Sequence, residues 1–385
     1  MNQQKIKLMF VTPSLTTGGA ERMAVDLLAG LNKDKFEVIL VLFGHEVVEN
    51  VGWAEELKKA NIRIERLYSE KIIKLGKIGG IIRAVSLSLK FWRLIKKEQP
   101  AIIHGQLFGD LYSRIVGLAA GIPVLISTEQ NVNHIEPRIL SFIKKLTANY
   151  ITKTVAISHA VEIGSMIRYG IREDKIIIIY NSVSVEKFYK ALESPQPAHD
   201  PFVFASIGRL SEQKGYNILI EAMVIVHAKY PTAICRIAGE GEDRKIIEEL
   251  IISHNLSQTI FLLGVEQNIP KFLAFSDCFV MPSLWEGLGI AALEAGLSGI
   301  PMIVSRIDGL AEIVGEDNGM LVPAGDSKAL AQAMIENIRL KGSSILFENS
   351  RRLQKNIINN FSLVKMVREY ENLYISLLSE HYANK

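Results

Sequence analysis

The chain has 385 residues, of which 48% are hydrophobic and 22% are charged, with a formal net charge of +3. This composition excludes a disordered chain, and the length favours more than one domain. Residues 1–195 contain 27 Lys and Arg against 19 Asp and Glu, whereas the remainder contains 17 against 22. The first half is therefore basic and would suit anionic lipid, a phosphorylated acceptor or nucleic acid, while the second half is acidic.

Neither a membrane span nor an oxidising compartment is indicated. The start, "MNQQKIKLMFVTPSL", lacks the apolar core of a signal peptide, and no uncharged apolar run reaches 18 residues. Both cysteines, Cys235 and Cys278, lie in apolar runs without a CxxC or Cys/His pattern, which predicts buried, reduced thiols. We therefore expect a cytoplasmic protein.

Short β-branched runs alternate with amphipathic segments along the first half of the chain. The predicted strands occupy residues 7–12, 36–43, 62–67, 101–105, 123–128, 154–158 and 175–180. Helical patterns such as 19–31 and 111–121 lie between them. This alternation predicts right-handed crossovers and a parallel sheet.

A proline-containing segment around 190–201, "KALESPQPAHDP", interrupts the pattern and is typical of a linker. Further strands are predicted at 202–208, 233–239, 260–264, 278–283, 301–305 and 319–323, followed by a last amphipathic helix, 363–382. We expect two α/β domains, each a doubly wound parallel sheet. The default ligand site is a cleft between them.

The turn in "TPSLTTGGAERMAVDLL" is the first candidate phosphate site. A strand ends at Thr12 and a helix begins near Ala20, so Gly18 and Gly19 lie where free N–H groups and the helix dipole suit a phosphate. Taken alone, an ordinary turn that uses glycine for its backbone angles explains the segment equally well.

The loop in "SIGRLSEQKGYNILIEA" is the second candidate. The strand ends at Gly208, and Arg209 and Lys214 follow before the next helix. Two cations at the carboxyl end of a strand are well placed to bind a diphosphate. The alternative is a pair of solvated loop charges.

The segment "SLWEGLGIAALEAG", residues 283–296, places Glu286 and Glu294 in an apolar, glycine-rich run. The N–H groups of Leu288 to Ile290 would point at an anion, and each acid could accept hydrogen bonds from sugar hydroxyls. If the segment were helical throughout, the acids would stand about 12 Å apart, roughly the span of a nucleoside diphosphate sugar. The alternative is that Glu286 caps the helix and Glu294 faces solvent.

A dinucleotide fingerprint is a rival interpretation of this segment. "GLGIAA" matches G-x-G-x-x-A after a strand, and Asp308 follows about 20 residues later. Bulky residues between the strand and the first glycine, and two glutamates beside a pyrophosphate site, argue against it.

The motifs together resemble the retaining glycosyltransferases of family 4, which have the GT-B fold. The segments "GGAE", "IGRLSEQKG", "IAGEGEDR", "FLLG", "MPSLWEGLGIAALEA" and "DGLAEIV…NGMLVPAGD" occur in the family's order, and "YNSVSVEKF" resembles its segment before the linker. The resemblance covers nearly the whole chain. It implies two Rossmann-like domains facing a central cleft: an acceptor-side domain, 1–190, and a donor-binding domain, 191–362. The helix 363–385 would pack back on the first domain.

The resemblance also implies roles for single residues. Arg209 and Lys214 would hold the donor diphosphate and stabilise charge on the leaving nucleotide. Glu286 would contact the donor sugar, and Glu294 would bind the ribose. The remaining donor contacts would come from Gly18, Gly19, Gly264, Val265, Gly287, Leu288, Gly289 and Ile290.

The sequence departs from the family near the strand 101–105. The family often has His-x-His there, whereas this chain has His104 followed by Gln106. His104 is therefore a candidate catalytic residue, with a locally bonded strand-end histidine as the alternative. Gln130 likewise stands where the family has a histidine. Retaining transfer in this fold is generally described as front-face attack assisted by the leaving phosphate, so we name no protein nucleophile.

No cofactor and no metal are expected. An Asp-x-Asp pair is absent from the sequence, and two fixed cations with helix N-termini can stabilise a leaving diphosphate in place of an ion. The expected donor is a UDP- or GDP-sugar.

Residues 71–97 contain eight Lys and Arg and no acid, with Phe91 and Trp92 among them. This pattern predicts peripheral contact with an anionic membrane. A core helix with a solvated cationic face is the alternative, and nucleic acid is not expected because no binding module is recognised.

The resemblance implies transfer of a hexose from a nucleoside diphosphate sugar to a saccharide or lipid-linked acceptor. The product would be a cell-surface polysaccharide or glycolipid, made in the cytoplasm or on the inner face of the cell membrane. Two alternatives stay open: a sugar-nucleotide epimerase of the same fold, and a non-catalytic sugar-nucleotide-binding partner subunit.

Overall fold

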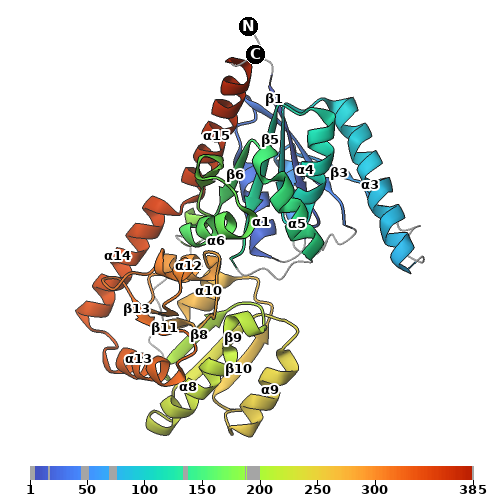
Figure 1. Cartoon of the computed structure of the whole chain (residues 1–385). Helices are drawn as coiled ribbons and strands as arrows, with labels where there is room; N and C mark the ends of the chain where they lie inside the picture. The colour runs from blue at the N-terminus through green and yellow to red at the C-terminus, as the bar shows by residue number, and fades with distance from the viewer. Residues whose placement is uncertain are drawn as a thin grey trace. The chain divides into compact units, whose positions relative to one another are not determined.

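The structure is a computed structural model that describes residues 5–15, 18–44, 52–68, 76–132, 138–186, 188 and 200–383. The chain divides into two compact units (Figure 1). Unit 1 comprises Met1–Asn181 and Leu363–Lys385, and unit 2 comprises Ser182–Ser362. The sequence predicts the boundary after residue 190 instead, and residues 190–199 of the predicted linker lie outside the described chain.

Unit 1 contains a parallel sheet of seven strands in the order β3-β2-β1-β4-β5-β6-β7. Its strands are β1 (Ile6–Thr12), β2 (Phe36–Leu42), β3 (Arg63–Arg66), β4 (Ile102–Gln106), β5 (Val124–Glu129), β6 (Lys153–Ala156) and β7 (Ile176–Ile178). The central strands are continuous apolar runs because helices cover both faces of such a sheet.

Five of the helices described in unit 1 contribute to two hydrophobic cores. They are α1 (Gly19–Gly30), α2 (Trp53–Lys59), α3 (Gly76–Glu98), α4 (Gly109–Ala120), α5 (Arg138–Thr147), α6 (His159–Tyr169) and α15 (Leu363–Ala383), with short 3₁₀ turns η3 (Ala148–Tyr150) and η4 (Glu173–Lys175). Residues of α1, α2 and α15 share one core with alternate residues of the strands, while α3 and α4 share the other.

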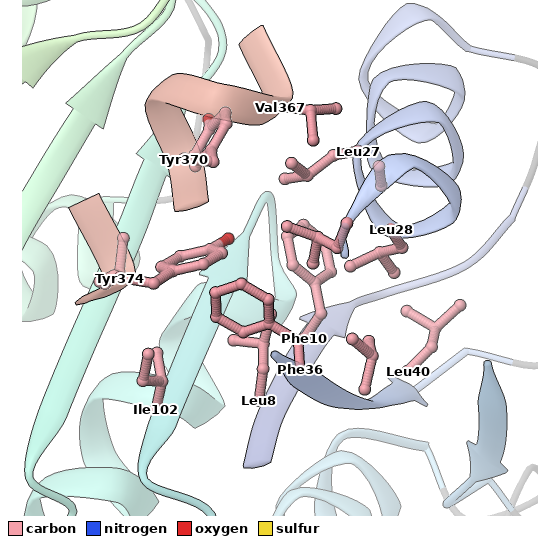
Figure 2. Packing of buried hydrophobic residues seen from close by; sticks show 14 of the residues in the cluster. Leu8, Phe10, Leu27, Leu28, Phe36, Leu40, Ile102, Val367, Tyr370 and Tyr374 are labelled. Carbon is pink, nitrogen blue, oxygen red and sulfur yellow. The ribbon is translucent and has the colours of Figure 1, made fainter. Parts of the chain in front are cut away.

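The last helix, α15, belongs to unit 1 although 181 residues of unit 2 precede it in the chain. Figure 2 shows Val367, Tyr370 and Tyr374 of α15 beside Leu27 of α1 and Phe10 of β1. Both tyrosines are fully buried. Rings of this size bury a large apolar area, so α15 is a structural part of this unit.

Unit 2 contains a six-stranded parallel sheet in the order β10-β9-β8-β11-β12-β13. Its strands are β8 (Val203–Ile207), β9 (Ile234–Ala238), β10 (Ile260–Gly264), β11 (Cys278–Met281), β12 (Met302–Ser305) and β13 (Met320–Val322). Its helices are α8 (Tyr216–Lys229), α9 (Arg244–Ser253), α10 (Ile269–Ala274), α11 (Ile290–Leu297), α12 (Asp308–Ala311), α13 (Ser327–Arg339) and α14 (Ser344–Asn360), with the 3₁₀ turn η5 (Glu212–Lys214).

Both sheets confirm the predicted fold class, and every strand predicted from the sequence is present within a few residues of its expected bounds. In each sheet the strand order reverses beside the first strand, which is the arrangement of a doubly wound fold. Cys235 and Cys278 are free and buried, as their apolar surroundings predict.

Candidate active site

The loops after β8 and β9 meet at the carboxyl edge of the unit 2 sheet. Gly239 has a φ of +151°, and a Cβ atom there would lie 1.9 Å from the carbonyl oxygen of Gly208. Only glycine permits this approach. The Leu210 N–H donates to the Glu240 carbonyl at 3.0 Å, so the Arg209 backbone lies on a braced loop.

A second close approach joins this loop to the segment after β11. Gly215 has a φ of +63°, and a Cβ atom there would lie 2.2 Å from the carbonyl oxygen of Pro282. The Leu284 N–H donates to the Gln213 carbonyl at 2.8 Å. The two predicted motifs therefore meet in space, although about 70 residues of chain separate them.

Lys214 and Glu286 form an ion pair at this junction. Ser283 Oγ donates to Glu286 Oε1 at 2.9 Å. The Gln213 amide donates to Glu286 Oε2 at 3.4 Å and to the Trp285 carbonyl at 2.9 Å. Glu286 is only 8% exposed, and these three donors offset the cost of burying its charge.

The helix that follows this carboxylate starts through a glycine. Gly289 has a φ of +92°, and α11 begins at Ile290. The carbonyls of Glu286 and Gly287 lie 2.6 and 2.7 Å from where a Cβ of Gly309 would stand, so α12 begins directly against this turn. Leu288 is buried, whereas Glu294 is half-buried within α11. Because residues 286–289 are not helical, the separation of Glu286 and Glu294 that a continuous helix would give does not apply.

The other predicted donor residues of unit 2 lie on the same edge of the sheet. Arg209 is exposed, and the structure assigns it no hydrogen bond or ion pair with any described residue. Gly264 ends β10 with a φ of +75°, and its carbonyl accepts from the Gly239 N–H at 2.7 Å. Val265 is 61% exposed. This edge therefore presents a cation and an apolar side chain to solvent.

In unit 1, the predicted glycines start α1 as expected. Gly18 is the N-cap, and α1 runs from Gly19, although residues 16–17 lie outside the described chain. The Glu21 carboxylate folds back, with an oxygen 2.3 Å from where a Cβ of Gly18 would stand. A carboxylate already complements this helix N-terminus, so a phosphate would have to displace it.

His104 lies inside unit 1 rather than at an open edge. Its ring is fully buried, with Nδ1 2.7 Å from the Tyr374 hydroxyl and Nε2 2.6 Å from Thr128 Oγ1. Burial among these neutral partners lowers the pKa of His104 to about 3. This geometry favours the local, structural interpretation of His104.

Gln106 and Gln130 lie near each other in unit 1. The Gln106 amide donates to Thr12 Oγ1 at 3.2 Å, and the Gln130 amide donates to Gln106 Oε1 at 3.5 Å. The Asn181 amide in turn donates to Gln130 Oε1 at 3.0 Å. Amides complete this hydrogen-bonded chain without titrating near neutral pH.

Ser283 and Gln213 hold Glu286 in the structure, although the motifs assign neither residue a role. Both stand inside the quoted motifs, but their partner is fixed by the approach of the two loops. In the described residues, no three His, Cys, Asp or Glu side chains gather closely enough to hold a metal ion. The described helices include none that is both long and apolar enough to span a membrane.

Two doubly wound parallel-sheet α/β units are the architecture of the GT-B fold, which solved glycosyltransferase structures share with this chain. The family model "Glycosyl transferases group 1" matches residues 189–360 of the sequence, and the family model "Glycosyltransferase Family 4" matches residues 17–187. The chain belongs to the family 4 glycosyltransferases.

Curated relatives agree with this family. An Escherichia coli UDP-Gal:alpha-D-GlcNAc-diphosphoundecaprenol alpha-1,3-galactosyltransferase is 28% identical over 77% of this chain and 81% of its own length. The Rhizobium meliloti lipopolysaccharide core biosynthesis glycosyltransferase LpsE is 32% identical, over 47% of this chain and 51% of its own.

Solved structures share the fold across nearly the whole chain. A glycosyltransferase from Rickettsia africae has a TM-score of 0.79 at 21% identity, covering 98% of this chain and 99% of its own. Anabaena HepE, solved in complex with UDP, has a TM-score of 0.80 at 19% identity, covering 97% of this chain and 100% of its own.

Proposed function

We propose that the protein is a retaining glycosyltransferase that moves a hexose from a nucleoside diphosphate sugar to a saccharide or lipid-linked acceptor. The observation that carries this proposal is the junction in unit 2, where Lys214, Glu286 and the start of α11 come together. A cation, a carboxylate and helix N–H groups are the partners that a sugar diphosphate needs.

Lys214 and Arg209 bind the donor diphosphate, and Glu286 accepts hydrogen bonds from the donor sugar. Because Lys214 pairs with Glu286 in the structure, a donor diphosphate would compete with the carboxylate for this ammonium. Glu294 accepts from the ribose, and Val265 lies beside the base. The galactosyltransferase relative is named for a UDP-sugar and HepE is solved with UDP, so uridine is the first base to test.

In the transfer step, the bond between the sugar anomeric carbon and the diphosphate oxygen breaks. The acceptor hydroxyl oxygen bonds to that carbon on the same face, and its proton passes to the departing phosphate. Arg209 and Lys214 stabilise the negative charge that develops on the diphosphate, and no metal is required. The protein supplies position and charge rather than a nucleophile.

The acceptor proposal draws on the relatives' names, which include a diphosphoundecaprenol acceptor and lipopolysaccharide core biosynthesis. A lipid-linked acceptor fits the peripheral membrane contact predicted for residues 71–97, of which 71–75 lie outside the described chain. The product would be a cell-surface polysaccharide or glycolipid.

A thermal-shift screen of UDP- and GDP-sugars, followed by product analysis in excess chelator, tests the proposal. We expect one donor to stabilise the protein, and transfer with retained anomeric configuration to persist in chelator. Activity that disappears with chelator and returns with manganese would contradict the metal-independent mechanism. Donor turnover without acceptor, giving an epimeric sugar, would favour the epimerase.

A further inference from the structure

Helix α3 of unit 1 has two apolar faces. Leu87, Phe91 and Ile95 are buried in the core that it shares with α4 and the sheet. On the opposite face Ile82, Val85, Leu89 and Trp92 are 42–54% exposed. An ordinary surface helix has a polar outer face, so core packing alone does not account for the second stripe.

Helix α5 repeats this pattern on the same side of the unit. Ile139, Phe142 and Leu146 follow the helical repeat and are 61–64% exposed. Helix α4 contacts both α3 and α5 and lies between them (Figure 1), and it exposes Ile115. By contrast, the described residues 5–68, which include α1 and α2, expose no large hydrophobic side chain.

Among the described residues 76–132 and 138–150, the charges exposed around these apolar side chains have one sign. The exposed cations are Arg83, Arg93, Lys96, Lys97 and Lys145. The described residues 76–132 and 138–150 contain three acids, Glu98, Asp110 and Glu129, and each is buried. Glu98 pairs with Arg63, Asp110 with Arg114, and Glu129 with Lys144. This part of the described surface therefore presents no acid to solvent.

A groove on α3 combines both chemistries. Its lining consists of Ile82, Val85, Ser86, Leu89, Lys90 and Arg93. Apolar side chains beside two cations match an acyl chain beside a phosphate. An interface with another protein ordinarily has a polar rim that carries charges of both signs. An anionic bilayer instead presents uniform negative charge above an apolar phase, which matches the cations and apolar side chains of this groove.

We propose that the outer faces of α3, α4 and α5, called here the α3–α5 face, dock on anionic lipid bilayers. The cations contact lipid phosphates, and the exposed aliphatic and aromatic side chains enter the boundary between head groups and acyl chains. Contact along several helices, rather than through α3 alone, fixes how unit 1 lies on the membrane. The biological reason for docking rests on the proposed function, because a lipid-linked acceptor is held in the same bilayer.

Flotation with phosphatidylcholine vesicles, with and without phosphatidylglycerol, tests the proposal on the full-length protein. The wild type should bind only the anionic vesicles. Arg93→Glu/Lys96→Glu/Lys97→Glu should weaken binding at least about tenfold, since each basic group contributes substantially near a charged surface. Ile139→Gln/Phe142→Gln/Leu146→Gln should weaken it about fivefold or more.

Matched controls come from unit 2. Lys229→Glu/Lys245→Glu/Lys328→Glu makes the same charge change at exposed positions, and Ile246→Gln/Ile252→Gln removes exposed apolar side chains from α9. Both should bind as the wild type does. Circular dichroism and melting temperature confirm that every variant is folded.

Three results would overturn the proposal. They are binding as strong as the wild type's by Ile139→Gln/Phe142→Gln/Leu146→Gln, the same by Arg93→Glu/Lys96→Glu/Lys97→Glu, or equal binding of the wild type to neutral and anionic vesicles. The flotation assay uses neither donor nor acceptor, so its failure is separable from failure of the proposed function. If the wild type binds no vesicle yet transfers sugar to a water-soluble acceptor, docking is wrong and transfer stands. If it binds anionic vesicles but transfers no sugar, docking stands and the proposed transfer is wrong.

Discussion

Each sheet places one candidate residue near the carboxyl end of a central strand, His104 in unit 1 and Glu286 in unit 2. The surroundings of these two residues differ. In unit 1, His104 is enclosed by the hydroxyls of Tyr374 and Thr128 and has no exposed surface. In unit 2, Glu286 stands on a turn beside the ammonium of Lys214. Neutral partners and full burial keep a histidine uncharged, whereas Glu286, although only 8% exposed, keeps a cationic partner beside it and lies next to the exposed Arg209 loop.

Similar strand-end positions therefore do not imply similar roles. A motif match places a residue at a strand end, but the elements packed over that end decide whether substrate can reach it. In unit 1 the covering element is α15, which comes from the far end of the chain. In unit 2 two loops meet over the strand ends and leave Arg209 and Val265 exposed.

Of the substitutions proposed here, we expect Glu286→Gln in unit 2 to change the protein's activity most. Glu286→Gln keeps the size of the side chain but removes the charge that the donor sugar meets. We expect the turnover number for transfer to fall by about 10²- to 10³-fold, as for removal of one preorganised electrostatic partner. Product formation at saturating donor measures it, with circular dichroism to confirm folding.

The matched control for this change is Glu249→Gln, which alters an exposed glutamate of α9 in the same unit. It should leave turnover unchanged. If Glu286→Gln transfers sugar within a few-fold of the wild-type rate, Glu286 is not the carboxylate that the reaction requires.

A smaller effect, on stability rather than turnover, is expected for His104. The pKa is about 3 in the folded protein against an ordinary value of 6.5, so between these values the unfolded chain binds one more proton than the native state. Stability is then present above pH 6.5 and is lost as pH falls toward 3. Lowering the pH from 7 to 5 should cost about 2 kcal/mol of unfolding free energy through this residue.

Urea unfolding of the wild type and His104→Gln at both pH values isolates this contribution, because the other titrating groups are common to both proteins. The variant should be less stable at pH 7 but should lose about 2 kcal/mol less on acidification. Its transfer rate at pH 7, per folded molecule, should stay near that of the wild type. A loss of more than about 10²-fold in a folded variant would instead support the catalytic role for His104.

Much of this architecture is predictable from the sequence because buried parallel strands are short, continuous apolar runs. The candidate donor residues Arg209, Lys214 and Glu286 are likewise marked by motifs. The ion pair between Lys214 and Glu286 is not, because it depends on the approach of Gly215 to the Pro282 carbonyl. The enclosure of His104 depends on α15, and long-range packing of this kind leaves no local pattern.

Smaller effects, on donor binding and stability, should distinguish the two cations Lys214 and Arg209 of unit 2. Lys214 is paired with a buried acid, whereas Arg209 is exposed. Lys214→Met should weaken donor binding and also lower stability by about 1 kcal/mol, because Glu286 would lose its charged partner while keeping its bonds from Ser283 and Gln213. Arg209→Met should weaken donor binding about tenfold or more without a change in stability beyond about 0.5 kcal/mol.

Calorimetric titration with the donor nucleotide and thermal unfolding of each variant measure the two quantities separately. The double variant Lys214→Met/Glu286→Gln sharpens the result, since removing both charges should restore much of the stability lost by Lys214→Met. If both single variants leave donor affinity unchanged, the diphosphate is held elsewhere. If Lys214→Met lowers affinity but not stability, the ion pair contributes nothing to the fold, and the carboxylate tolerates burial through Ser283 and Gln213 alone.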